Sequence, residues 1–129
     1  MDAYDELYAY TMGRRGFILQ HVVDAHQAQT ATPSTAAIGV VFSLVGLYLH
    51  VERGFTGTQV QQAHVRMAAK KRTWPVIELP LDRGALTAGE VLAAPPGSAR
   101  DEAIDEWCRA VWRAFSASRD TIVALAQEY

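Results

Sequence analysis

A chain of 129 residues can bury enough apolar surface for one cooperative core but too little for two, so we expect a single domain over residues 1–129. Its formal net charge of -2, with both signs mixed along the chain, excludes the basic surface that recruits nucleic acid or an anionic membrane. The single cysteine, Cys108, excludes an internal disulfide.

The first segment, residues 2–11, has the pattern of a short helix. Tyr4, Leu7 and Thr11 recur at helical spacing behind an acidic first turn, which suits a helix N-terminus. The segment lacks the basic and apolar regions of a signal peptide. We therefore expect a soluble protein of the reducing cytoplasm.

The next predicted helix, residues 17–29, carries a histidine and a carboxylate that can touch. His21 and Asp24 lie at positions i and i+3. A carboxylate beside an imidazole can orient a buried ring or supply two ligands to a divalent metal ion. A satisfied polar pair inside the core explains the same two residues, so both interpretations stay open.

Residues 36–53 predict the central helix of the fold. The run from Ala36 to Leu49 contains no charge, so the helix is apolar around most of its circumference and belongs in the core. The run is also too short to span a bilayer. One stripe of this helix carries small and polar residues: Gly39, Ser43, Gly46, His50 and Arg53. Such a stripe either admits a closely packed second helix or leaves a groove that ends at the imidazole of His50.

A short connection around Pro33 joins the two helices just described. Short connections make neighbouring helices antiparallel. The late part of the central helix should therefore lie beside the early part of the preceding one. This arrangement predicts that His50 approaches His21.

Thr56 and Gln59 form a capping box, which predicts the start of the next helix. His64 lies on the apolar face of this helix. The basic residues 70–72 at its end complement the helix dipole, which explains them without nucleic acid.

The rest of the chain predicts an extended connection and two further helices. Two prolines within about residues 74–86 favour a segment that wraps the bundle instead of forming a sheet. A short helix capped by Thr87 follows, and a long amphipathic helix begins near Ser98, with a candidate kink at 116–118. The expected fold is all-α: a four- to five-helix bundle around the helix at about 36–53.

Three histidines on inward or groove faces, namely His21, His50 and His64, are the candidate metal ligands. Helical bundles build metal sites from such side chains on facing helices, and a histidine-rich set suits Zn²⁺, Ni²⁺ or Fe²⁺. The candidate polar pocket comprises these histidines together with Asp24, Glu52 and Arg53. The chain contains no HExxH, ExxH, CxxC or GxSxG motif, so no catalytic residue can be assigned and enzymatic activity is left open.

Six segments spread over most of the chain carry a family resemblance. They are YTMG at 10–13, QHVVDA at 20–25, LYLHVERGFTG at 47–57, KRTWP at 71–75, DRGALTAGEVLAA at 82–94 and WCRAVWRAF at 107–115. Together they resemble an uncharacterised family of small bacterial proteins, a domain of unknown function. The resemblance implies no activity.

Fuller members of that family begin with a CPxCG segment, show VDAY followed by Q-H-P, and carry histidines after the last tryptophan pair. Here His26 replaces the tyrosine, Thr30 stands in place of the next histidine, and Ser118 and Arg119 replace the late histidines. These departures argue against a family-wide metal site in this chain. The matching polar positions that remain are Asp24, Gln29 and the turn Glu52-Arg53-Gly54, which a structural role would also explain.

Two hypotheses about function remain. In the first, the protein is a self-associating binding or structural domain, most simply a homodimer. A small bundle has difficulty burying all of its large apolar residues, in particular Trp74, Trp107, Trp112 and Phe115, so a helix face would complete its burial in a dimer.

In the second hypothesis, the protein is a metal-dependent or small-ligand-binding bundle that resembles the DinB type. His21, His50 and His64 would then bind a divalent ion, and Asp24 would orient a small-molecule ligand.

Overall fold

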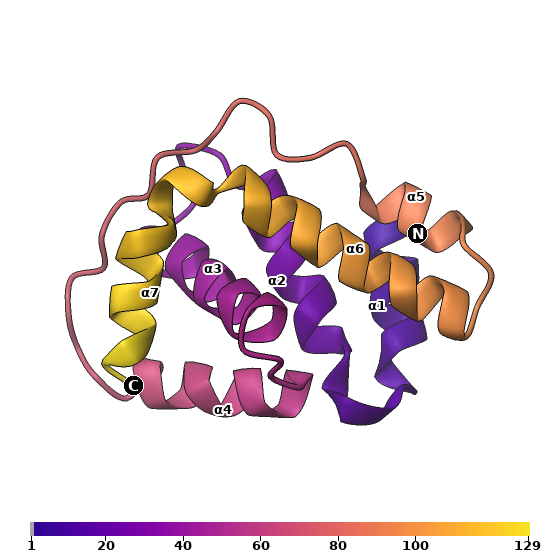
Figure 1. Ribbon diagram of the computed structural model, residues 1–129, viewed down its shortest axis with the longest axis horizontal. Coiled ribbons are helices and arrows are strands. Elements are labelled where there is room, and N and C mark those ends of the chain that lie inside the picture. The colour runs from indigo at the N-terminus through magenta and orange to yellow at the C-terminus, as the bar shows by residue number, and fades with distance from the viewer. Residues whose placement is uncertain (1) are drawn as a thin grey trace.

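Helix α3 (Ala37–Val51) lies at the centre of the computed structural model, which describes residues 2–129 (Figure 1). Every residue from Val40 to Leu49 is buried except Phe42, which is half-buried. The predicted central helix is thus confirmed, with slightly shorter bounds than 36–53. Its charge-free sequence leaves no side that favours water, so other helices enclose it.

Seven α-helices and two short 3₁₀ segments account for the regular structure, and residues 2–129 contain no strand. In chain order they are α1 (Ala3–Met12), η1 (Arg15–Phe17), α2 (Leu19–Thr30), α3 (Ala37–Val51), α4 (Gly57–Ala68), α5 (Ala88–Ala93), α6 (Ser98–Ala114), η2 (Ser116–Ser118) and α7 (Arg119–Gln127). The all-α prediction is confirmed, and the number of helices exceeds the four to five expected. Within this part of the chain, no helix is both long and apolar enough to cross a membrane.

One of the additional helices arises from a break in the predicted last helix. The backbone leaves helical geometry at Phe115 (φ −94°, ψ 21°), and η2 turns the chain before α7 begins. Phe115 is buried at this turn, which anchors it in the core. Both α6 and α7 pack on α3 as a result, and Figure 1 shows α7 running steeply away from the line of α6. The candidate kink at 116–118 is therefore a full change of direction.

Helix α2 packs closely against the stripe of small residues on α3. A Cβ atom added at Gly46 would lie 1.9 Å from the Oδ2 atom of Asp24, and one added at Gly39 would lie 2.9 Å from the Nε2 atom of Gln27. At position 46 only glycine leaves room for the buried Asp24 side chain, whereas at position 39 the flexible end of Gln27 could move aside. Close packing thus accounts for the stripe between these two glycines, which was the first of the two interpretations.

Residues 71–87, which we call the strap, carry no regular structure and join α4 to α5. Figure 1 shows the strap passing around the outside of the helices, as the prediction of a wrapping connection requires. Trp74 and Ile77 anchor it in the core. Val76 and Leu81, in contrast, are exposed. Only part of the strap is therefore anchored in the core.

Gln29 fixes the far end of the strap to the bundle. Its side-chain amide donates to the backbone carbonyls of Leu86 at 2.7 Å and Arg83 at 3.3 Å. Its Oε1 atom accepts from the indole N–H of Trp107 at 2.9 Å. A single side chain of α2 therefore connects the strap to α6.

We predict that Gln29→Ala loosens the strap and lowers the free energy of unfolding by about 1–3 kcal/mol, because the buried indole N–H of Trp107 loses its acceptor. Amide hydrogen exchange should rise at residues 83–87 before it rises in α3. The matched control is Gln61→Ala, since Gln61 is exposed on α4. Equal exchange in the two variants would contradict the role of Gln29.

Candidate functional site

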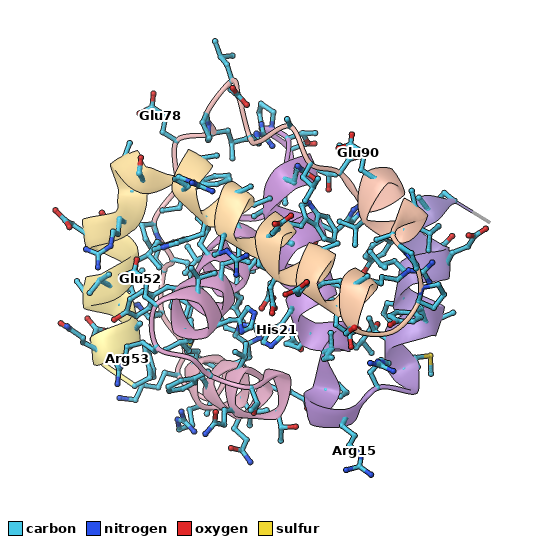
Figure 2. The ribbon with its side chains drawn as sticks, turned by 45° about the vertical axis from the view of Figure 1, so that its right-hand side comes forward. Arg15, His21, Glu52, Arg53, Glu78 and Glu90 are labelled. Atoms are coloured by element: carbon cyan, nitrogen blue, oxygen red, sulfur yellow. The ribbon has the colours of Figure 1, made fainter. Side chains whose placement is uncertain are left out.

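The rings of His21 and His50 stack face to face between α2 and α3. Their centroids lie 3.5 Å apart and their planes differ by 17°. His21 is buried, and Figure 2 shows it in the interior of the bundle beside α3. This is the proximity that the short connection between the two helices predicts.

His50 is held by hydrogen bonds at both ring nitrogens. Its Nδ1 atom lies 3.1 Å from the carbonyl oxygen of Phe55, and its Nε2 atom lies 2.9 Å from Oδ1 of Asp105. A carbonyl and a carboxylate can only accept, so the arrangement suits an imidazolium ring that donates to both. The hydrogen bond to His50 is also the main reason that the pKa of Asp105 lies below its usual value.

His21, in contrast, is neutral and incompletely hydrogen-bonded. Burial, together with the positive charge of His50, lowers the pKa of His21 to about 3. Its Nδ1 atom is buried and has no hydrogen-bond partner. A neutral ring with a free nitrogen therefore stacks on a ring that is fixed on both sides.

The two histidines line a cavity of about 310 Å³, which we call the histidine cavity. Its walls come from η1, the end of α3, the start of α4 and the first two turns of α6. Arg15, Asp101 and Asp105 contribute the other charged side chains. The cavity thus combines charges of both signs with one neutral imidazole.

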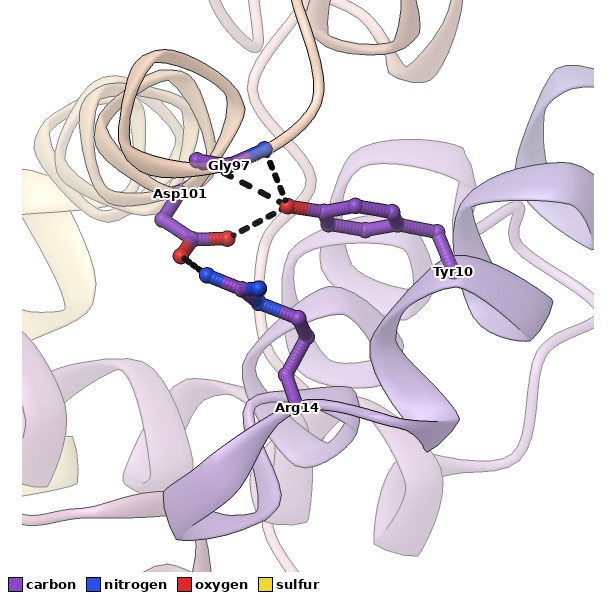
Figure 3. Close-up of polar contacts among 4 residues, drawn as sticks. All are labelled: Tyr10, Arg14, Gly97 and Asp101. Carbon is purple, nitrogen blue, oxygen red and sulfur yellow. Dashed lines mark hydrogen bonds and ion pairs between the residues drawn. The ribbon is translucent and has the colours of Figure 1, made fainter.

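A cluster of polar contacts fixes the α6 side of this cavity (Figure 3). The hydroxyl group of Tyr10 donates to Oδ1 of Asp101 at 2.9 Å and accepts from the backbone N–H of Gly97 at 3.0 Å. The guanidinium group of Arg14 pairs with the other oxygen of Asp101. Residues of α1 and of the turn that follows it therefore orient the carboxylate of Asp101 at the cavity wall.

Asp24 lies deeper in the same α2–α3 interface and turns towards Gly46. Its Oδ1 atom accepts from Nε2 of Gln20 at 3.0 Å, while its Oδ2 atom is buried without a partner. Burial raises the pKa of Asp24 well above its ordinary value, so the protonated form is favoured. Because Oδ2 of Asp24 and Nδ1 of His21 both lack partners, these atoms do not form the contact that their spacing allows.

Glu52 and Arg53, also assigned to the candidate pocket, point elsewhere. Glu52 accepts from the indole N–H of Trp112 at 2.7 Å and from Nε of Arg119 at 2.8 Å. The guanidinium carbon of Arg53 lies 5.8 Å from the ring centroid of Phe55. Figure 2 shows Glu52 and Arg53 at the periphery, apart from His21. Neither residue lines the histidine cavity.

His64 is also separate from the stacked histidines. Its Nε2 atom lies 2.7 Å from the backbone carbonyl oxygen of Phe42, and the two rings stack with centroids 5.3 Å apart. Phe42 precedes His50 by two helical turns, which is about 12 Å along α3. The structure therefore brings together two of the three candidate metal ligands. Among residues 2–129, no three His, Cys, Asp or Glu side chains form a group that could hold a metal ion.

Asp101 and Asp105 are site residues that the sequence reasoning did not identify. They lie one turn apart on α6, and Cys108 and Trp112 continue the same face at the next helical spacings. The buried stripe of α6 was recognised from its apolar members only. The sequence signal for them is that two carboxylates continue the buried face of α6 towards its N-terminus.

Gln29, Glu52 and Asp24, the polar positions on which the family resemblance rests, differ in role. Gln29 and Glu52 use their side chains to tie the strap and α7 to the bundle. Asp24 retains an oxygen without a partner. Structural contacts thus explain the first two positions, and the third faces the interface that leads to the stacked histidines.

Comparison with known proteins places the chain in a family. The family model described as a family of unknown function, DUF5946, matches residues 1–116. The chain belongs to DUF5946. No curated protein and no solved structure matches the chain. The matched region contains every residue of the histidine cavity, and the DUF5946 description assigns no activity, so the function has to be argued from geometry.

Proposed function

We propose that this member of DUF5946 binds a small polar molecule in the histidine cavity. The observation that carries the proposal is the stacked pair at the cavity wall, in which His50 is fixed at both nitrogens and His21 keeps a buried nitrogen without a partner. A buried polar atom without a partner costs about 1–3 kcal/mol. Buried polar atoms without a hydrogen-bond partner are frequent at binding and catalytic sites.

The charges around the cavity indicate the class of ligand. Arg15 supplies positive charge, while Asp101 and Asp105 supply negative charge. A volume of about 310 Å³ suits a molecule of amino-acid size. A zwitterion would meet charges of the opposite sign on two sides, so free amino acids are the appropriate first probes.

The proposal predicts that titration with individual free amino acids shifts the ring NMR signals of His21 and His50. His21→Ala and Asp105→Asn should each weaken the binding about tenfold or more, since the first removes the imidazole from the cavity wall and the second removes a negative charge. His64→Ala is the matched control, because His64 contacts Phe42 and does not line the cavity. The proposal is wrong if no amino acid shifts the two signals, or if His21→Ala binds as tightly as the unchanged protein.

The metal-dependent alternative is tested on the same samples with Zn²⁺, Ni²⁺ and Fe²⁺. Its support is the proximity of two candidate ligands, His21 and His50, while His64 is too distant to join them. One equivalent of tightly bound metal that is lost in His21→Ala but kept in His64→Ala would favour this alternative. Binding that depends on His64 would require a rearrangement of α4.

Self-association as a homodimer also stays a prediction, together with a bacterial origin and a cytoplasmic location. The four aromatic residues that suggested a dimer are buried within one chain: Trp74, Trp107, Trp112 and Phe115. Large exposed apolar side chains such as Met12, Val65 and Val76 belong to three different segments. Light scattering coupled to size-exclusion chromatography would decide between monomer and dimer.

A further inference from the structure

A second cavity, of about 450 Å³, lies between the end of α3, the second half of α6 and the start of α7. We call it the arginine cavity, because Arg109, Arg113 and Arg119 line it. It shares no lining residue with the histidine cavity. The two cavities are therefore separate sites.

The arginine cavity concentrates positive charge in a protein whose net charge is -2. Three guanidinium groups line it together with one carboxylate, that of Glu52. Arg109 and Arg113 lie one turn apart on α6, and neither forms an ion pair with any residue in 2–129. An excess of two positive charges therefore remains in the cavity.

Glu52 organises one side of the cavity. Its carboxylate accepts from Nε of Arg119 and from the indole N–H of Trp112. The contact with Arg119 is the main reason that the pKa of Glu52 is lowered, so the carboxylate is ionised at neutral pH. Arg119 and Trp112 are thus held in place, while Arg109 and Arg113 have no counter-ion.

The rest of the lining indicates what accompanies an anion in this cavity. Val51 and the ring of Trp112 provide apolar surface, and the hydroxyl group of Ser116 can donate a hydrogen bond. The cavity volume leaves room for a group larger than a bare oxyanion. Guanidinium groups bind phosphate oxygens with paired, charge-assisted hydrogen bonds.

The geometry points to the arginine cavity as a binding site for a small phosphate monoester. The dianionic phosphate balances the two excess positive charges of Arg109 and Arg113, and the ester group rests against Trp112 and Val51. Ser116 donates to a phosphate oxygen. The site recognises both the phosphate charge and the apolar ester group of the ligand. A site for inorganic phosphate would recognise the charge alone.

The test is a titration of the full chain with phenyl phosphate, followed by tryptophan fluorescence, since Trp112 lines the cavity. Saturable binding is expected, about fivefold or more tighter than that of inorganic phosphate and weaker at high salt. Arg113→Gln should weaken binding about tenfold, the loss of one charge-assisted contact. Arg109→Gln should act in the same direction, although Arg109 also lowers the pKa of Asp105 through its charge.

Arg66→Gln is the matched control, because it removes the same charge from α4 and Arg66 does not line the cavity. The three substituted residues, Arg66, Arg109 and Arg113, are exposed, so the variants should keep the circular dichroism and melting temperature of the unchanged protein. The inference is overturned if phenyl phosphate does not saturate, if phenol binds equally well, or if Arg113→Gln and Arg66→Gln bind alike. Tighter binding of succinate than of phenyl phosphate would also overturn it, in favour of a dicarboxylate.

Discussion

Replacing Gly46 by alanine is expected to destabilise the protein by about 1–3 kcal/mol, because it over-packs the interface between α2 and α3. The added Cβ would lie 1.9 Å from Oδ2 and 2.7 Å from Cγ of Asp24, and 3.1 Å from Cγ1 of Val60. Asp24 is buried and cannot swing out to solvent, so the helices must separate or the carboxyl group must take a strained conformation. Chemical denaturation at neutral pH measures this loss.

Gly39→Ala on the same helix is the matched control. Its Cβ would meet only the end of the Gln27 side chain, which can move, and alanine favours a helix over glycine by about 1 kcal/mol. We expect little loss or a small gain of stability in this variant. In the background of Asp24→Ala, Gly46→Ala should cost much less, since the clashing carboxyl group is gone. An equal cost in both backgrounds would show that the contact with Asp24 is not the cause.

Acidification is expected to lower the free energy of unfolding through His21. The unfolded chain binds a proton at this ring near pH 6.5, while burial and the charge of His50 keep the folded-state pKa at about 3. A folded-state pKa below the unfolded value gives stability that is complete above pH 6.5 and is lost as the pH falls towards 3. The slope contributed by this one group approaches about 1.4 kcal/mol per pH unit.

The contribution of His21 has to be separated from that of other buried groups. The pKa values of His26 and His64 are also lowered by burial, and they act in the same direction. Asp24 acts in the opposite direction, since its raised pKa makes it destabilising as the pH rises. His21→Phe keeps a planar ring on His50 but cannot titrate, so urea denaturation between pH 7 and pH 4 should show a flatter profile for this variant. A profile as steep as that of the unchanged protein would contradict the assignment.

The central helix and the wrapping strap could be predicted because their sequences allow few alternatives. The charge-free run of α3 has to be buried, and the prolines of the strap prevent a regular helix there. The break after α6 was harder to predict, because Ile122 and Leu125 continue the apolar spacing of α6 across it. Their burial after a change of direction shows that periodicity fixes the buried face of a segment and leaves its axis undetermined.

The same limit explains how much of the candidate site could be predicted. His21 and His50 could be paired because a short connection sets the relative height of their helices. His64 could be assigned to the inner face of α4, but nothing local fixes where along α3 that face makes contact, and it meets Phe42. Asp105 comes from a helix that is distant in sequence, so its approach to His50 depends on the tertiary packing of α6.

The strap also has a topological consequence. Its apex at Leu81 is fully exposed. Trp74 and Ile77 anchor the strap before this point, and the hydrogen bonds from Gln29 to the backbone of Arg83 and Leu86 anchor it after this point. The peptide bonds at Leu81 can therefore be broken without removing a buried contact. The residues before and after Leu81 thus pack into one common core. We expect the fold to tolerate a peptide inserted at Leu81, and the two fragments made by cleavage there to bind each other.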